Sequence, residues 1–250
     1  MKKIYEQNEL TFALIWIGIY CVLQSLANPL NEAIGIKNSA SAVFCIIQAV
    51  VLFSFVRKNN LLVKYGLCRP RASARQFLYY IPLLIVATSN LWNGIAVKLS
   101  ALDTVFHVAL MLCVGFIEEV IFRGFLFKAI AKNNVKTAIV ISSITFGMGH
   151  LLNLFNGSGM SLAANLFQIA YAVALGFLFV MIFYHSGSLI PCIAAHSVIN
   201  ILSAFATDFT IEKRIFCNII EFTIIAVYLL ILAKTFPWKQ ETSTHSDCLC

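Results

Sequence analysis

Long apolar runs fill most of this chain, and they constrain its fold more than any other feature. A run of about 20 apolar residues is long enough to cross the hydrocarbon core of a bilayer as an α-helix. Such runs are too long and too evenly apolar for membrane-barrel strands, which alternate in hydrophobicity over about 10 residues. We count eight, at residues 10–27, 39–56, 77–92, 104–127, 136–155, 162–184, 187–206 and 215–235. The sequence therefore predicts an all-α, polytopic membrane helix bundle of about eight transmembrane helices.

The composition agrees with a bilayer environment. Of the 250 residues, 60% are hydrophobic and 12% are charged, whereas about 25% of the residues in a soluble domain are charged. We find no internal repeat and no second domain, so we expect a single domain over residues 1–250, with its motifs in a core at 104–206. The first run lacks the small-residue cleavage site of a signal peptide, which favours a retained span. Most of the eight cysteines lie in apolar runs, so no disulfide framework is indicated.

The positions of the basic residues predict the orientation in the membrane. Cytoplasmic segments of membrane proteins carry an excess of Lys and Arg. If the N-terminus lies in the cytoplasm, 13 of the 18 Lys and Arg residues lie in inside segments, 4 lie outside and Arg123 lies within a span. We therefore expect a multi-pass protein, of a bacterial cell membrane, with both termini in the cytoplasm. The net charge of +7 then reflects topology, and no pattern of basic and aromatic residues indicates nucleic-acid binding.

The segment GFIEEVIFRG, residues 115–124, places three ionisable side chains in an apolar run. Charged groups inside a membrane are costly, and they are candidates for functional sites. Glu119 and Arg123 are four residues apart on one helix face, so we expect them to pair. Glu118 points about 100° away from Glu119 and has no local partner. The two adjacent glutamates are therefore predicted to have different roles.

Two further motifs repeat the four-residue spacing within apolar runs. FGMGH places Phe146 and His150 on one face, with two glycines that would let another helix approach closely. HSVIN places His196 and Asn200 one turn apart. Counted from the predicted span ends, Glu118 and the two histidines reach similar depths of roughly 13–21 Å. We therefore expect three helices to converge on one site.

Other polar residues and the terminal cysteines are not predicted to belong to that site. His107 lies close to the start of a run and is expected at the membrane interface. Glu221, in the last run, faces no partner that the sequence identifies. Cys248 and Cys250 close the chain without a C-a-a-X box, and no role is assigned to them.

The chemistry of the converging residues indicates hydrolysis. A carboxylate in a wet cavity can act as a general base on water, especially beside a histidine. A histidine and an asparagine can donate hydrogen bonds to a developing oxyanion. No GxSxG motif indicates a serine nucleophile, and no pair of aspartates lies within the spans. These features favour a peptidase that uses activated water and forms no covalent enzyme intermediate.

The motifs EEVIFR, FGMGH and HSVIN resemble, in this order, the EExxxR, FxxxH and HxxxN motifs of the CPBP family. This is the family of type II CaaX-prenyl endopeptidases and bacteriocin-processing proteins, also called Abi. The resemblance implies an eight-helix intramembrane glutamic endopeptidase with a cavity that opens to the cytoplasm and no cofactor. It implies a peptide or a lipidated protein as the substrate, in peptide maturation or in bacteriocin self-immunity.

By motif position, the resemblance also implies roles for individual residues. The pair that activates water would be Glu118 and His150. The oxyanion of the reacting carbonyl would be held by His196 and Asn200. Three neighbours would support the site without performing the chemistry: Glu119, Arg123 and Phe146.

Other classes of function remain open on the residues alone. A zinc metalloprotease could bind its metal through Glu118, His150 and His196, although no HExxH motif is present. A proton-coupled transporter could relay protons through the same groups, but this would not explain Asn200 one turn from His196. A binding or immunity protein whose hydrolytic activity matters little is a third class.

We predict a site without a metal ion. Histidines that bind zinc are usually oriented by a second carboxylate or carbonyl. The carboxylate available for this purpose is Glu119, and we expect it to be committed to Arg123. The sequence does not specify the natural substrate or the oligomeric state.

Overall fold

The computed structural model describes residues 1–70, 80–154, 161–208 and 210–235. Within these residues the chain forms an all-α bundle, which confirms the predicted fold class. The longer helices are α2 (Glu9–Ile34), α3 (Ser39–Lys58), α5 (Ala101–Glu118), α7 (Val135–Met148), α8 (Leu162–Ser186), α9 (Ile190–Leu202) and α10 (Ile211–Thr235). The shorter segments are α1 (Lys2–Gln7), α4 (Ile81–Ala87), α6 (Lys128–Ala131), the 3₁₀ turns η2 (Ser89–Leu91), η4 (Gly149–Leu154) and η5 (Ser203–Phe205), and the π-helix η3 (Glu119–Phe127).

Local sequence signals explain where the long helices begin and end. The first N–H groups of a helix have no partner within it, and an N-cap side chain can accept a hydrogen bond from one of them. Gly35 and Gly187 end α2 and α8 in the left-handed conformation, which glycine adopts without steric cost. The side chains that cap α2, α5, α7 and α8 are Asn8, Ser100, Asn134 and Ser161.

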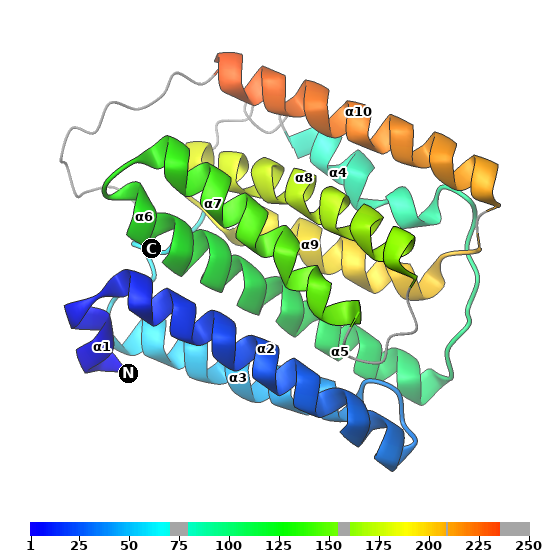
Figure 1. Ribbon diagram of the computed structural model, residues 1–250, viewed down its shortest axis with the longest axis horizontal. Helices are drawn as coiled ribbons and strands as arrows, with labels where there is room; N and C mark the ends of the chain where they lie inside the picture. Colours follow the sequence, from blue (N-terminus) through cyan, green and yellow to red (C-terminus); the bar gives the residue numbers. More distant parts are fainter. Residues whose placement is uncertain (71–79, 155–160, 209, 236–250) are drawn as a thin grey trace.

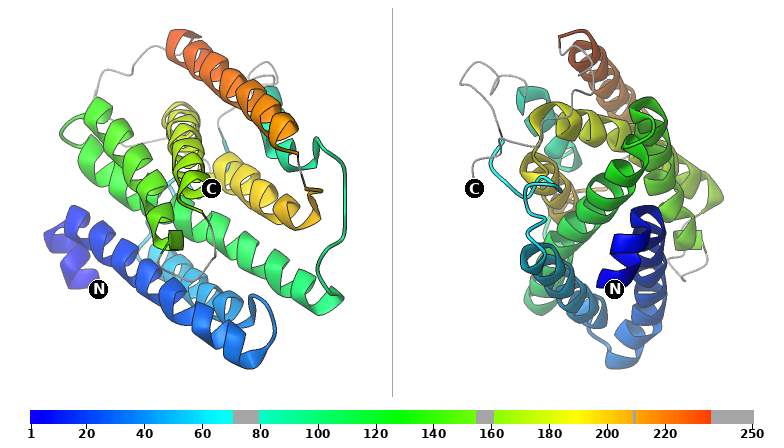
Figure 2. Two further views of the ribbon diagram at one scale, coloured as in Figure 1. Left: turned by 45° about the vertical axis from the view of Figure 1, so that its right-hand side comes forward. Right: turned by 90° about the vertical axis from the view of Figure 1, so that its left-hand side faces the viewer.

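A continuous helical rod, Ala101–Ala131, runs through the middle of the bundle and consists of α5, η3 and α6 (Figure 1 and Figure 2). The helices α2 and α3 pack on one side of this rod, and α7, α8 and α9 pack on the other. The helix α10 covers α8 and α4. Every residue of the π-helical part is buried, and π segments inside α-helices are frequent at functional sites.

Two glycines allow neighbouring helices to approach closely, one between α5 and α9 and the other between α7 and α8. A Cβ atom at Gly115 would overlap the Oγ of Ser197, so α5 and α9 can touch backbone to backbone. A Cβ atom at Gly147 would overlap the side chain of Val173, so α7 lies equally close to α8. The close approach predicted for the FGMGH glycines is therefore confirmed at Gly147. It is wrong for Gly149, whose added Cβ would meet no atom within 4 Å.

Among the described residues, six helices are long and apolar enough to cross a membrane. A further apolar helix, Ile190–Phe205, is shorter; at 1.5 Å per residue it spans about 24 Å, less than the roughly 30 Å of a hydrocarbon core. In the run 77–92, the described residues form the seven-residue α4 and the turn η2, and residues 77–79 lie outside the described part. The multi-pass bundle is confirmed, and the count of eight spans stays a prediction. The six helices that are long enough to cross a membrane are Glu9–Ile34, Ser39–Lys58, Ala101–Ala131, Val135–Leu154, Leu162–Ser186 and Glu212–Thr235.

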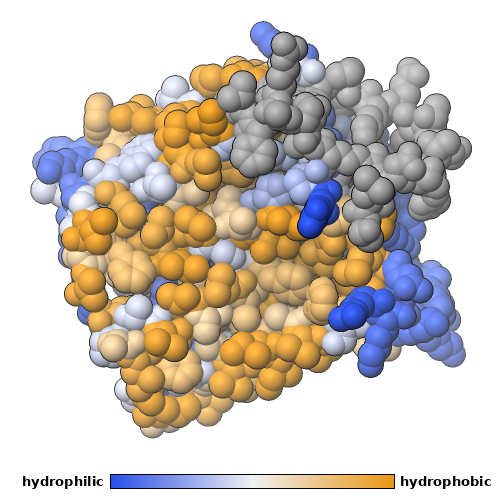
Figure 3. Space-filling model, turned by 180° about the vertical axis from the view of Figure 1, so that it is seen from behind, coloured by the Kyte–Doolittle hydropathy of each residue, from blue (hydrophilic) through white to orange (hydrophobic). Residues whose placement is uncertain are grey.

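The two ends of the bundle carry different charges. One end, here the terminus end, holds α1, the start of α7 and the last turn of α10 (Figure 1). The other, the distal end, holds residues 35–38, 92–100 and 203–208. Between the ends, the face shown in Figure 3 is mostly apolar. The basic residues at the distal end are Lys37, Lys98, Lys213 and Arg214, and the other described ones, apart from Arg123, lie toward the terminus end.

Candidate active site

A fully buried ion pair lies at the centre of the bundle. Oε1 of Glu119 lies 3.0 Å from Nη1 of Arg123, and both side chains are 0% exposed. The same oxygen of Glu119 lies 2.9 Å from Nδ1 of His196 on α9. The predicted pair of Glu119 and Arg123 is therefore confirmed. The expectation that Glu119 is committed to Arg123 is wrong, because its carboxylate also orients the imidazole of His196.

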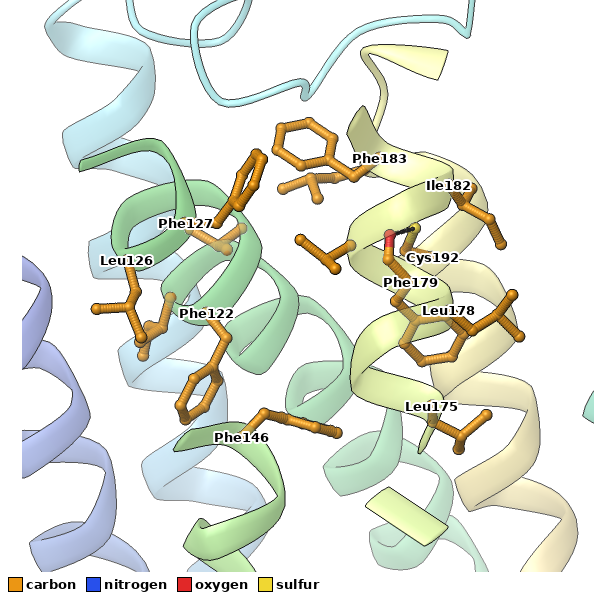
Figure 4. Packing of buried hydrophobic residues seen from close by; sticks show 14 of the residues in the cluster. Phe122, Leu126, Phe127, Phe146, Leu175, Leu178, Phe179, Ile182, Phe183 and Cys192 are labelled. Atoms are coloured by element: carbon orange, nitrogen blue, oxygen red, sulfur yellow. Dashed lines mark hydrogen bonds between the residues drawn. The ribbon is translucent and has the colours of Figure 1, made fainter. Parts of the chain in front are cut away.

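Aromatic rings enclose the guanidinium of Arg123. Its Cζ atom lies 4.0 Å from the ring centroid of Phe146 and 5.6 Å from that of Phe179. Figure 4 shows Phe146 beside η3 and Phe179 on α8. Nε and Nη2 of Arg123 have no hydrogen-bond partner among the described residues. The part of the guanidinium that Glu119 does not contact therefore lies against the two aromatic rings. A desolvated cation–π contact of this kind contributes about 2 kcal/mol.

Phe146 also contacts both histidines of the motifs. Its ring centroid lies 5.9 Å from that of His150 and 5.6 Å from that of His196, and both contacts are edge-on. A single ring therefore contacts the buried guanidinium and both imidazoles. Phe146, which is predicted to support the site, also lines the cavity.

Glu118 shares His196 with Glu119, but its other partner is different. Its Oε1 accepts a hydrogen bond from the hydroxyl of Tyr20 on α2, at 2.6 Å. Its Oε2 lies 3.5 Å from Nε2 of His196. The side chain of Glu118 retains 12% exposure where that of Glu119 has none. The two adjacent glutamates therefore contact opposite nitrogens of one imidazole, Glu118 from the cavity side and Glu119 from the buried side.

A cavity of about 430 Å³ is lined by the residues of all three motifs. This volume lies within the roughly 300–1,000 Å³ of typical ligand sites. The charged pair of Glu119 and Arg123 lies behind the cavity wall and is not part of its lining. The predicted residues that do line it are Glu118, Phe146, His150, His196 and Asn200.

The position of His150 depends on the end of α7. The α-helix stops at Met148, and His150 belongs to the 3₁₀ turn η4. The carbonyl oxygen of His150 accepts a hydrogen bond from Nδ2 of Asn165 at 2.8 Å, which ties this turn to α8. Asn165 is completely buried. The imidazole of His150 is therefore held at the cavity by a backbone contact that its own motif does not contain.

The position of Asn200 depends on the end of α9 in the same way. The last carbonyl groups of a helix have no partner within it. Nδ2 of Asn90 donates to the carbonyl of Ile199 at 2.7 Å, and Nε2 of His107 lies 3.1 Å from the carbonyl of Asn200. His107 is 8% exposed. His107 is therefore buried and helps to fix the helix end that carries Asn200, while its place at the membrane interface stays a prediction.

The structure places His196, and not His150, at ion-pair distance from Glu118. Within the described residues, the imidazole at ion-pair distance from Glu118 is that of His196, and no nitrogen of His150 lies within 4 Å of its carboxylate oxygens. His150 and Glu118 nevertheless line the same cavity. A water molecule between them would therefore be needed to connect the pair that the resemblance assigns to water activation.

The described residues contain no group of three or more His, Cys, Asp or Glu side chains arranged to hold a metal ion. The expectation that Glu119 is unavailable to orient a histidine is nevertheless wrong, because its carboxylate contacts Nδ1 of His196. A site without a metal ion stays a prediction, which the zinc content of the purified protein tests.

Glu221 lies outside the cavity, and it does have a partner. Its Oε1 accepts a hydrogen bond from the hydroxyl of Tyr171 on α8 at 2.5 Å, and the residue is 7% exposed. Sequence reasoning missed both tyrosine–glutamate contacts. Tyr20 lies 98 residues from Glu118, and Tyr171 lies 50 residues from Glu221. A tyrosine within an apolar run carries no sequence signal for such a contact.

The cavity extends from the middle of the bundle to its distal end. Its lining on α2 covers the middle of that helix, from Ile17 to Asn28. On the other helices it includes Asn153 in η4 and Ser203 in η5, both at the distal end. The cytoplasmic location of the termini and the side of the membrane to which the cavity opens both stay predictions.

The comparisons with known proteins agree with the motifs. No curated protein and no solved structure matches the chain. Residues 100–202 match a family model described as "Type II CAAX prenyl endopeptidase Rce1-like". The matched region contains all three motifs and every predicted site residue. Residues 100–202 are therefore similar to the Rce1-like type II CAAX prenyl endopeptidases, which confirms the resemblance drawn from the motifs.

Proposed function

We propose that this protein is an intramembrane glutamic endopeptidase, which hydrolyses a peptide bond with water activated in the cavity. One observation carries the proposal. Glu118, His150, His196 and Asn200 come from three different motifs and line one cavity in an otherwise apolar bundle. Glu119 and Arg123 lie behind the wall and hold His196 in place.

The charges of the site suggest the state in which it works. Nδ1 of His196 contacts Glu119, and Nε2 faces Glu118. If both nitrogens carry a proton, two carboxylates, one guanidinium and one imidazolium form an electrically neutral set. Buried charges are tolerated only when they are paired. A protonated His196 therefore neutralises the second glutamate, which Arg123 alone cannot do.

The reaction then follows from the donors and acceptors in the cavity. Glu118 removes a proton from a water molecule, which His150 helps to position, and the water oxygen attacks the peptide carbonyl carbon. The developing oxyanion accepts hydrogen bonds from Nε2–H of His196 and from the amide of Asn200. Glu118 returns its proton to the departing nitrogen as the peptide bond breaks. No covalent bond forms between the enzyme and the substrate.

The distribution of basic residues supports an orientation with both termini in the cytoplasm. In that orientation the distal end faces the other side of the membrane, and the cavity lining reaches this end at Asn153 and Ser203. The substrate would then be a peptide or lipidated protein reached from the extracytoplasmic side, as in peptide maturation or bacteriocin self-immunity at a bacterial cell membrane. A substrate delivered from the cytoplasm would require the opposite orientation.

The proposal can be tested with the purified protein in lipid nanodiscs. The probes are a prenylated CAAX-type peptide with a fluorophore and a quencher on either side of the scissile bond, and the same peptide without the prenyl group. We expect cleavage by the wild type and none above background by Glu118→Gln. Glu221→Gln is the matched control, because it changes a buried glutamate outside the cavity, and it should retain activity.

The outcomes separate the parts of the proposal. Cleavage of both peptides would mean that the prenyl group is not required, and cleavage of the prenylated one alone would assign a lipidated substrate. Full activity of Glu118→Gln would overturn the proposed mechanism. Equal loss in Glu118→Gln and Glu221→Gln would show that the assay reports damage to the bundle and would also remove the support for the site.

A further inference from the structure

The hydroxyl of Tyr20 contacts the carboxylate that the proposed function makes the general base. Tyr20 lies in α2, outside the matched region 100–202, and none of the three motifs contains it. Its Oη lies 2.6 Å from Oε1 of Glu118. It also lines the cavity, together with Ile17, Cys21, Gln24 and Asn28 of the same helix. The wall that faces the motifs is therefore built from α2.

The contact restricts Glu118 in a specific way. The terminal torsion of a glutamate has a broad, roughly two-fold distribution, so an unrestrained carboxylate can exchange its two oxygens. In the structure, Oε1 accepts from Tyr20 and Oε2 faces His196. The two oxygens are therefore not equivalent. One is occupied by a phenol from α2, and the other remains available for water and for the imidazole.

We propose that Tyr20 is a positioning residue, which holds the Glu118 carboxylate in the orientation needed to take a proton from water. The proposal rests on the proposed function, because it assigns a role relative to Glu118 as the base. Hydrogen bonds to charged groups are shorter and stronger than those between neutral groups. A tyrosine donor at 2.6 Å is therefore well suited to fix a carboxylate at the edge of a wet cavity.

The chain supplies a matched control for this role. Tyr171 donates to the buried carboxylate of Glu221 through the same chemistry, also between two helices. Neither Tyr171 nor Glu221 lines the cavity. Removal of either hydroxyl should affect helix packing similarly, whereas removal of the Tyr20 hydroxyl alone should affect catalysis.

The test compares Tyr20→Phe and Tyr171→Phe in nanodiscs, with steady-state cleavage of the prenylated or unprenylated peptide that the wild type accepts. We expect Tyr20→Phe to lower kcat by about 10- to 100-fold, the range for loss of a hydrogen bond to a charged group. Its KM should remain within about threefold, because the interaction acts on the reacting groups and not on substrate binding. Tyr171→Phe should keep the kcat and KM of the wild type.

The outcomes distinguish this proposal from the proposed function. If Glu118→Gln is inactive and Tyr20→Phe has the kcat of the wild type, the role of Tyr20 is overturned and the function stands. If Glu118→Gln is active, the function itself fails. A loss of kcat of the same size in Tyr20→Phe and Tyr171→Phe would also overturn the proposal, since it would indicate a general effect on packing.

A second variant covers the case in which Tyr20→Phe does not fold. Incorporation of 3,5-difluorotyrosine at position 20 keeps the ring and the hydroxyl but changes the acidity of the donor. We expect an intact thermal transition and a change in kcat of more than about threefold, since the strength of the donor acts directly on the carboxylate. An unchanged kcat with this side chain would overturn the role of Tyr20.

Discussion

Replacement of Glu119 by glutamine should destabilise the protein far more than the same change at the adjacent Glu118. Glu119 is 0% exposed and contacts both Arg123 and His196 through one oxygen. Removal of its charge leaves the buried guanidinium without an anionic partner. Loss of one member of a buried pair costs roughly 3–5 kcal/mol, and the second contact, to His196, favours the upper part of that range.

The loss expected for Glu118→Gln is smaller. A glutamine at position 118 can still accept the hydrogen bond from Tyr20, and this side chain lies at the edge of the cavity. We expect a cost below about 1.5 kcal/mol, the net value of one ordinary hydrogen bond. At roughly 2–4 °C per kcal/mol for a chain of this size, the melting temperature should fall by about 6–20 °C for Glu119→Gln and by less than about 6 °C for Glu118→Gln.

The assay is thermal unfolding of both variants in the same detergent, followed by intrinsic fluorescence. Arg123→Met and the double variant Glu119→Gln/Arg123→Met provide the control. Since the double change removes both charges of the pair, it should cost less than the sum of the two single changes. Equal losses for Glu118→Gln and Glu119→Gln, or a strictly additive double variant, would refute the separate roles of the two glutamates.

Three further predictions concern catalysis, metal content and topology. Asn200→Ala should lower kcat by about 10²–10³ with little change in KM, as for a lost oxyanion donor; full kcat with weaker substrate binding would instead make Asn200 a binding or packing residue. The purified protein should contain far less than one zinc ion per chain and should cleave its substrate after prolonged treatment with a strong chelator, whereas stoichiometric zinc with activity lost on chelation and restored by metal would make the site a metal centre. A reporter fused after residue 65 should be cytoplasmic and one inserted at 152–160 should be external; the reverse locations would turn the cavity toward the cytoplasm.

The fold class and five of the residues that line the candidate cavity could be predicted from the sequence, because these depend on local patterns. Long apolar runs predict helices that span a bilayer, and the four-residue spacing of Glu119 and Arg123 predicts their pair. The apolar composition of residues 77–92 predicted one span. The described residues of this run form the short helix α4 and the turn η2 instead of one long helix. An apolar composition indicates that a segment can lie in lipid, but it does not indicate whether the segment forms one continuous helix.

Contacts between distant helices could not be predicted in the same way. The double role of Glu119 depends on where α9 places His196, 77 residues away. The hydroxyl of Tyr20 and the carbonyl contacts of Asn90, His107 and Asn165 are tertiary contacts without a motif. The end of the bundle that the cavity lining reaches is likewise a tertiary property, because the lining comes from residues of several helices.

The central claim is that water activated by Glu118 attacks the peptide bond directly. The most direct measurement is a single turnover in H₂¹⁸O, with mass spectrometry of the product and of the intact enzyme. Direct attack predicts one ¹⁸O atom in the new carboxylate of the product, no ¹⁸O in the side chain of Glu118 and no covalent adduct at any time. A product without ¹⁸O, label transferred to Glu118, or an acylated enzyme during the turnover would contradict the claim.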